Sequence, residues 1–189
     1  MVRRDIKHHY FFGAFPPILE GNRIHAFAQG LHGQWNLVEV PRLHMTIAIT
    51  EHVPVPMPAI AAALLRAGEA VRAEPFEIVL DQLSANPGPE SVVLRPARVI
   101  PAAKELHAAV REAMIAEGVP LRTNFRFSPH VTLGYGKNGP SFTRPVQPFG
   151  WKVSELVLIH SVAGAHLHKM LGRWTLEPAP EKQLSLFAA

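Results

Sequence analysis

Two histidine-threonine pairs recur in the sequence, and their residue types suit acid–base chemistry. His44 and Thr46 stand two positions apart in HMTI at 44–47, and His130 and Thr132 stand two apart in HVTL at 130–133. Histidine titrates near neutrality, so two imidazoles can hold one neutral and one protonated member at working pH. Two such pairs facing each other across a cleft would supply a base, an acid and two hydroxyl anchors.

Reaction at phosphorus is the chemistry that such groups serve best. One group must take a proton from the nucleophile, and another must give one to the leaving oxygen. Threonine hydroxyls can donate hydrogen bonds to the non-bridging phosphate oxygens and stabilise the charge that develops there. A single His-x-Thr tripeptide is usually a half-buried histidine beside a β-favouring threonine. Two copies with matching aliphatic neighbours favour catalysis instead.

Strand geometry predicts where these side chains point. Successive side chains of a strand alternate between its faces, so each histidine shares a face with its threonine. Met45, Ile47 and Ile49 are then expected on the opposite face, in a core. The next residues on the polar face are Ala48 and Gly134, whose small size would leave room for a ligand.

Hydrophobic periodicity predicts the elements that must position these residues. Apolar runs predict strands at 10–15, 35–40, 43–50, 76–83, 91–95, 129–136, 153–162 and 166–176. Apolar residues at helical spacing predict helices after the prolines at 16–17, after Pro58, and from Pro101 to Gly118. The turn cluster at 86–89 predicts a hairpin. These elements favour an α+β fold with mainly antiparallel sheet.

Composition sets broad limits on the protein. Its 189 residues are 48% hydrophobic and fit one domain, or two small lobes that share a cleft. A net charge of +4 suits a polyanion such as RNA, although many proteins without that role carry as much. The chain has no cysteine, which excludes disulfides, thiolate metal sites and a cysteine nucleophile. No apolar run approaches a membrane span or a signal peptide, so we expect a soluble cytoplasmic protein.

Longer segments around the motifs resemble a known family. These segments are YFFGAFPP at 10–17, VPRLHMTIA at 40–48, SPHVTLGYG at 128–136, LVLIHS at 156–161 and LGRWTL at 171–176. In this order they are similar to the two-histidine phosphoesterase superfamily, in particular its bacterial 2′-5′ RNA ligase and RNA 2′,3′-cyclic phosphodiesterase branch. The resemblance implies two pseudo-symmetric α+β lobes of antiparallel sheet with helices, one motif in each lobe and the active site between them.

The resemblance also implies an activity and the role of each histidine. The expected reaction is hydrolysis of an RNA 2′,3′-cyclic phosphate to a 2′-phosphomonoester, with 2′-5′ ligation as its reverse, and with no cofactor or metal. His44 would donate a proton to the leaving oxygen, and His130 would activate water. Tyr135 stands where many members have an arginine, and His168 where members often have an aromatic residue. The substrate preference therefore stays open.

Two further kinds of activity are compatible with these motifs. The same machinery could act on a small cyclic nucleotide or on the 3′ end of an oligonucleotide. A module of the same fold could bind RNA ends without turnover, although such a binder has no need for two proton-transfer groups.

Other polar residues are weaker candidates. Arg42 lies two residues before His44 and Arg126 four before His130, and on a strand such even spacing would put each arginine on the face of its histidine. Both arginines could hold phosphate, as could Tyr135. Solvated arginines at strand ends are equally common. His166 and His168, which share a strand face, and the adjacent His8 and His9 lack a third metal ligand at suggestive spacing. They are expected to be polar strand positions and part of a disordered terminus.

The end of the chain carries a separate signal. We expect residues 1–176 to form a single bilobal domain and 177–189 to form a flexible tail. Within that tail Gln183, Leu184, Ser185, Leu186 and Phe187 resemble the short motif by which bacterial proteins dock on the replication sliding clamp. The EPAPEK segment at 177–182 would act as a tether that presents the apolar side chains. The alternative is that the tail packs on its own lobe.

Overall fold

One antiparallel sheet runs through the described part of the protein, which in the computed structural model comprises residues 7–32, 35–86, 91–136, 141–163, 165 and 167–177. Its strands are β1 (Lys7–Ala14), β2 (Asn36–Leu37), β3 (Met45–Ile49), β4 (Phe76–Asn86), β5 (Ser91–Arg95), β6 (Val131–Tyr135), β7 (Phe142–Val153), β8 (Glu155–Ala163) and β9 (Leu167–Thr175). The helices are α1 (Ile18–Gln29), α2 (Pro58–Ala70) and α3 (Pro101–Ala116), with a 3₁₀ turn η1 (Val40–Arg42).

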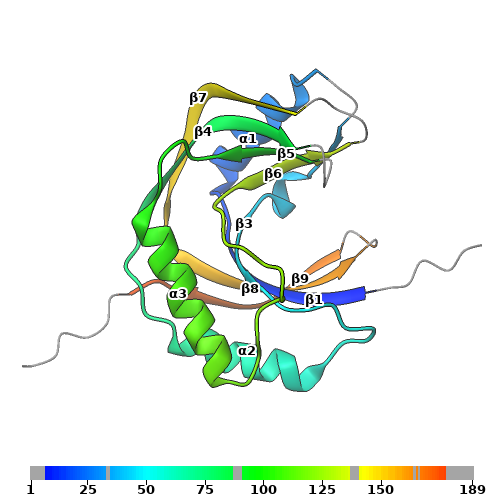
Figure 1. Ribbon diagram of the computed structural model, residues 1–189, viewed down its shortest axis with the longest axis vertical. Helices are drawn as coiled ribbons and strands as arrows, with labels where there is room; N and C mark the ends of the chain where they lie inside the picture. The colour runs from blue at the N-terminus through cyan, green and yellow to red at the C-terminus, as the bar shows by residue number, and fades with distance from the viewer. Residues whose placement is uncertain are drawn as a thin grey trace, which may run out of the picture.

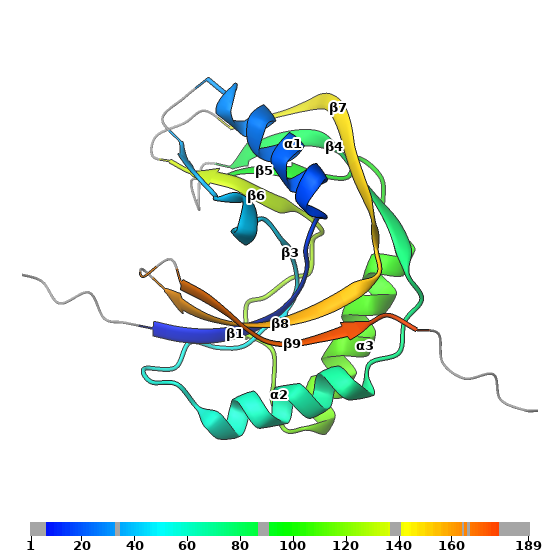
Figure 2. The ribbon, with the colours of Figure 1, turned by 180° about the vertical axis from the view of Figure 1, so that it is seen from behind.

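The strand order divides the sheet into two halves. The order is β7-β4-β5-β6-β3-β1-β8-β9, with β2 beside β6, and every pairing is antiparallel. The sheet curves like a letter C, with α1 against the β4–β7 half and α2 and α3 against the other half (Figures 1 and 2). The α+β fold with two antiparallel lobes is confirmed. The lobes share one continuous sheet and meet at β3 and β6.

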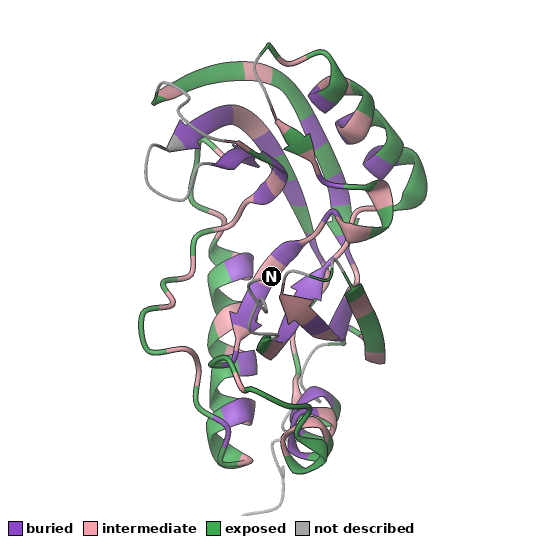
Figure 3. Cartoon of the chain, turned by 90° about the vertical axis from the view of Figure 1, so that its right-hand side faces the viewer, coloured by how far each residue is buried: buried purple, intermediate pink, exposed green. Residues whose placement is uncertain are grey.

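The helices begin where the sequence predicts. Pro58 and Pro101 occupy the first turns of α2 and α3, where a missing backbone N–H costs nothing. On α3 the predicted apolar stripe of Leu106, Val110 and Met114 is completely buried. Each helix turns its buried side to the sheet and its exposed side to solvent (Figure 3). None of the described helices is long and apolar enough to cross a membrane.

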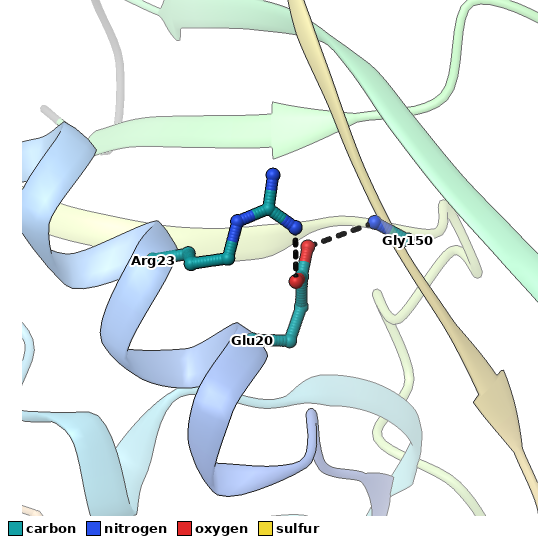
Figure 4. Close-up of polar contacts among 3 residues, drawn as sticks. All are labelled: Glu20, Arg23 and Gly150. Carbon is teal, nitrogen blue, oxygen red and sulfur yellow. Dashed lines mark hydrogen bonds and ion pairs between the residues drawn. The ribbon is translucent and has the colours of Figure 1, made fainter.

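A buried carboxylate fastens α1 to the sheet. Glu20 accepts hydrogen bonds from the Gly150 backbone N–H at 3.0 Å and from Arg23 Nη1 at 2.6 Å (Figure 4). A side chain at position 150 would put its Cβ 2.8 Å from the Ile78 carbonyl oxygen, so glycine is required for this close strand pairing. The hydrogen bonds stabilise a charge that would otherwise be costly to bury.

Sequence patterns miss one long strand. β7 contains Pro145 and Pro148, which argue against a strand in the interior of a sheet. β7 lies at one end of the strand order, where an edge tolerates residues that cannot donate to a neighbour. The predicted extended run at 35–40 is also shorter than expected, because only β2 pairs before η1 begins.

Candidate active site

The two histidine-threonine motifs meet where the lobes join. Met45 at the start of β3 pairs with Val131 at the start of β6. Because the strands are antiparallel, continuing this register by one residue places His44 opposite Thr132 and Thr46 opposite His130. Each histidine therefore lies across from the threonine of the other motif.

Matching hydrogen bonds orient the two imidazole rings. His44 Nδ1 lies 2.6 Å from the Arg42 carbonyl oxygen, and His130 Nδ1 lies 2.7 Å from the Ser128 carbonyl oxygen. A carbonyl oxygen only accepts, so Nδ1 carries the hydrogen in both rings. In the neutral rings Nε2 then has a free lone pair, as a general base requires, and in a protonated ring it donates.

A β-bulge follows the threonine in each motif. The pairing of β1 with β3 skips Ile47, because Gly13 pairs with Thr46 and Phe12 with Ala48. The pairing of β5 with β6 likewise skips Leu133. An extra residue in one strand reverses the alternation of side chains beyond it.

These bulges correct two of the expectations from strand parity. Ile49 lines the cavity described below instead of entering the core, and it pairs with Phe11. Ala48 is completely buried and pairs with Phe12 on the core side. The side chain of Ala48 therefore points away from the cleft, so its small size does not make space for a ligand there.

Position 134 requires a glycine for a reason other than space for a ligand. A Cβ at this position would lie 3.1 Å from the Asn36 carbonyl oxygen and 3.2 Å from the Trp35 Cβ. The close neighbour is thus β2 and the residue before it, and the glycine allows β2 to pair with β6.

The backbone carbonyl groups of both bulge residues accept hydrogen bonds from partners outside the two strand pairings in which the bulges occur. The Ile47 oxygen accepts a hydrogen bond from His107 Nδ1 at 2.8 Å, and the Leu133 oxygen accepts one from the Val38 N–H at 2.8 Å. The His107 ring also stacks on Phe127, with centroids 4.6 Å apart and planes 9° apart. His107 on α3 thus contacts β3 and the segment that leads to His130. No sequence pattern pointed to this role, because His107 appears there as one polar residue of an amphipathic helix.

A cavity of about 740 Å³ lies between the lobes at these motifs. The structure brings five of the predicted site residues into its lining, namely Arg42, His44, Thr46, Thr132 and Tyr135. His130 is half-buried beside the cavity and is absent from the described lining. Residues from both motifs thus border one space large enough for a small ligand.

Arg126 is not among the residues that line the cavity. The strand begins only at Val131, and residues 125–130 adopt no regular structure, so strand parity does not relate Arg126 to His130. Arg126 is exposed and does not appear in the described lining of the cavity. Strand alternation therefore does not support a position beside His130, and the role of Arg126 in substrate binding stays a prediction.

Aromatic packing sets the charge state of His44. Its ring stacks on Phe11 at 4.5 Å between centroids and lies 5.5 Å from the ring of Phe15. Burial lowers the pKa of His44 to about 4, despite the favourable hydrogen bond to the Arg42 carbonyl, and positive charge on His168, His130 and Arg42 lowers it further. His44 is therefore neutral near pH 7 in the protein alone.

The strands β1 and β9, which carry neither motif, contribute ring side chains to the lining. His9 and Phe11 on β1 and His168 on β9 border the cavity, and the His168 ring meets His44 edge-on at 5.5 Å. The expectation of a disordered terminus at 8–9 is wrong, since both histidines belong to β1. The spacing of His9 and Phe11 at i and i+2 was the available signal that they share a face.

Histidine, cysteine, aspartate and glutamate are the usual protein ligands of zinc. Within the described ranges, no group of three or more histidine, cysteine, aspartate or glutamate residues could hold a metal ion.

Comparisons with known proteins agree with this architecture. The family model of the 2′-5′ RNA ligase superfamily matches residues 16–165. The crystal structure of Escherichia coli LigT in apo form is similar, with a TM-score of 0.73 and 22% identity, over 90% of this chain and 98% of that one. TT0787 of Thermus thermophilus gives a TM-score of 0.68 and 18% identity over 90% and 98%. No curated protein matches the sequence.

The structural likeness establishes the shared fold, and the family model matches most of the chain. Both motifs lie within the matched residues, at the junction of the lobes. The protein belongs to the 2′-5′ RNA ligase superfamily of two-histidine phosphoesterases.

Proposed function

We propose that this phosphoesterase hydrolyses RNA 2′,3′-cyclic phosphate ends to 2′-phosphomonoesters and catalyses reversible 2′-5′ ligation at the same site. One observation carries the proposal. His44 and His130 are held by the same Nδ1–carbonyl hydrogen bond, on either side of the Met45–Val131 pair. Each ring therefore keeps Nε2 for proton transfer, which meets the demand of the reaction for one base and one acid.

The reaction assigns one proton transfer to each ring. His130 Nε2 takes a proton from water as the water oxygen attacks phosphorus. The bond between phosphorus and the 3′ oxygen then breaks, and His44 donates a proton to that oxygen. The product carries a 2′-phosphate and a 3′ hydroxyl. In ligation the 5′ hydroxyl of a second RNA replaces water as the nucleophile, and the same two proton transfers follow.

The low pKa of His44 makes its protonation depend on the substrate. In the protein alone burial disfavours the imidazolium, with the pKa at about 4. An anionic phosphate beside the ring would offset that penalty and raise the pKa, so His44 would take up its proton as the substrate binds. The acid is then formed only when there is a leaving group to receive the proton.

The threonines and nearby polar residues would hold the phosphate. Thr46 and Thr132 line the cavity from the two lobes and can donate hydrogen bonds to different non-bridging oxygens. Arg42, in the same lining, adds positive charge. A nucleotide substrate is supported by E. coli LigT of the same fold, which has been crystallised with 3′-AMP, ATP and NADP+.

An RNA oligonucleotide with a 2′,3′-cyclic phosphate end, incubated with the protein in EDTA, tests the proposal. We expect a 2′-phosphate product, and His44→Ala or His130→Ala should each lower kcat by about 10²- to 10⁴-fold. The rate should depend on pH as a bell-shaped curve. His32→Ala, which changes an exposed histidine outside the cavity lining, is the matched control. A strict need for added metal would contradict this mechanism.

The alternative activities have separate readouts. A preference for a small cyclic nucleotide or for a free oligonucleotide 3′ end would show in the same assay with those substrates. Binding of RNA ends without any product would instead identify a non-catalytic module.

A second proposal concerns the C-terminal tail, where residues 183–187 lie outside the described residues. We propose that Gln183, Leu184, Ser185, Leu186 and Phe187 dock on a bacterial sliding clamp and recruit the enzyme to DNA. Its support is the sequence motif alone. Removal of residues 183–189 should abolish clamp binding in a pull-down with purified clamp. Equal binding before and after truncation would eliminate the idea.

A further inference from the structure

A row of three polar side chains crosses the floor of the cavity beside His44. His9 on β1 pairs with Ser161 on β8, and Ser161 pairs with His168 on β9. Residues directly opposite in antiparallel strands project from the same face. All three line the 740 Å³ cavity, and the strands that carry them lie side by side (Figure 1). None of the three belongs to a histidine-threonine motif.

The two histidines of this row differ from the catalytic candidates in their hydrogen bonds. In His44 and His130 a carbonyl oxygen accepts from Nδ1. In His9 and His168 Nδ1 is buried and has no hydrogen-bond partner among the described residues. Burying an unpaired N–H is costlier than burying an unpaired ring acceptor, so the favoured tautomer carries its hydrogen on Nε2. Nε2–H is then the group through which each ring can meet a ligand.

Both rings are uncharged donors near neutral pH. Burial lowers the pKa of His168 to about 4, with a further contribution from Arg42. Burial likewise lowers the pKa of His9 to about 4, and positive charge on His52 and Arg122 acts in the same direction. An uncharged N–H donor suits a neutral acceptor such as a ring nitrogen or a carbonyl oxygen. A second phosphate would instead be better matched by permanent cations.

The position of the row relative to His44 suggests which part of a substrate meets it. The His168 ring lies edge-on to His44 at 5.5 Å and edge-on to Phe11 at 5.4 Å. Ile49, Val162 and Ala163 add apolar lining to the same cavity. A group bound here would adjoin a phosphate at His44, would contact apolar surface, and would accept hydrogen bonds without carrying charge. A nucleobase has all of these properties.

We propose that His9, Ser161 and His168 form a subsite that binds the nucleobase attached to the reacting phosphate through its acceptor atoms. The inference rests on the proposed function for the identity of the ligand as a nucleotide. It assigns base recognition to β1, β8 and β9, apart from the two catalytic motifs. Substrates should therefore be ranked by the acceptor atoms of their bases.

Binding of nucleoside 3′-monophosphates, compared with ribose 3-phosphate, tests this subsite by isothermal titration calorimetry on the full chain. The variants His9→Phe and His168→Phe keep an aromatic ring but remove its nitrogens. Each should weaken binding of the nucleotides about fivefold, the usual effect of one neutral hydrogen bond, and leave ribose 3-phosphate binding unchanged. His160→Phe is the matched control, because His160 lies on β8 next to Ser161 but pairs with Tyr10 on the opposite face of the sheet.

Three results would overturn the subsite. The first is an equal loss of affinity for the nucleotides and for ribose 3-phosphate in the variants. The second is unchanged affinity in both variants. The third is a wild-type protein that binds nucleotides and ribose 3-phosphate equally tightly. Circular dichroism of each variant separates loss of binding from loss of folding. Because binding is measured without turnover, a protein that fails to cleave cyclic phosphates but retains the expected pattern would refute the proposed function and not the subsite.

Discussion

At the scale of single residues, the two motif histidines share an anchor but differ in surroundings. The ring of His44 stacks on Phe11 and lies near Phe15, and burial lowers its pKa to about 4. His130 has the same bond to a carbonyl oxygen but sits in the segment that leads into β6. Similar tripeptides therefore provide rings with the same tautomer in different packing surroundings.

The threonine hydroxyls allow a test at this scale. Thr46→Val and Thr132→Val keep the branched shape and remove the hydroxyl, so a hydrogen bond to the charge that develops on phosphate is lost. We expect kcat to fall on the order of 100-fold for each variant, with a smaller change in KM. Steady-state kinetics on a cyclic-phosphate substrate measure both constants.

Serine replacements provide the control for these variants. Thr46→Ser and Thr132→Ser keep the hydroxyl and should retain most of the activity. If serine and valine variants were equally impaired, the methyl group and not the hydroxyl would be the important feature.

At the scale of elements, β3 and β6 carry equivalent bulges beside the candidate site. Ile47 and Leu133 are the extra residues of β3 and β6, and each comes directly after a motif threonine. Their carbonyl oxygens accept hydrogen bonds from His107 on α3 and from Val38 beside β2. The bulge in β3 brings Ile49 to the cavity and sends Ala48 into the core. Two short segments with similar sequences thus acquire the same irregularity through different partners.

The role of His107 can be tested by His107→Phe. Phenylalanine keeps the stacking on Phe127 but leaves the Ile47 carbonyl without its donor. The free energy of unfolding should fall by about 1–3 kcal/mol, the cost of an unsatisfied buried polar group. Urea denaturation measures this change. The activity of the folded variant should fall as well, because β3 carries Thr46 and directly follows His44.

Arg111→Ala on α3 is the control for His107, since Arg111 is exposed. This control should leave both stability and activity nearly unchanged. A His107→Phe protein with wild-type stability and kcat would show that the hydrogen bond to Ile47 has no positioning role.

At the scale of the whole molecule, the bent sheet places buried histidines at the junction of its two lobes. His9, His44 and His168 border the same cavity, and burial is the main cause that lowers the pKa of each to about 4. Folding therefore favours the neutral form of three groups that would each titrate near 6.5 in an unfolded chain. The effect of these three buried histidines on the free energy of unfolding therefore depends on pH.

Stability should consequently fall as the pH is lowered. Between the unfolded pKa of about 6.5 and the folded pKa of about 4, the unfolded chain binds more protons, so acid favours unfolding. The stability that these neutral histidines contribute is fully present above about pH 6.5 and is lost as the pH falls toward 4. For each histidine the free energy of unfolding falls by up to about 1.4 kcal/mol per pH unit. Urea denaturation between about pH 7 and pH 5 stays above the usual carboxylate range and measures the slope.

His168→Phe provides the comparison for the pH series. Removing one of the three titrating groups should flatten the dependence of stability on pH. A wild-type protein whose stability does not change over this range would contradict the lowered pKa values.

The sequence by itself determined the class of fold and predicted the chemistry. Repeated His-x-Thr tripeptides indicate candidate acid–base residues, because both the side-chain types and their spacing are local properties. Apolar periodicity and prolines likewise predicted α2, α3 and the hairpin of β4 and β5, since a helix face or a tight turn depends on neighbouring residues. The strand β7 escaped prediction because the tolerance for Pro145 and Pro148 comes from its place at a sheet edge.

Only the tertiary structure decided how the two histidine-threonine pairs of the sequence become one site. A bulge depends on which residues of a distant strand oppose it, so the sequence could not show that Ile49 and Ala48 exchange faces. The His9–Ser161–His168 row exists only through the pairing of β1, β8 and β9. Strand parity assigns a residue to a face, but non-local register decides which face borders the cleft.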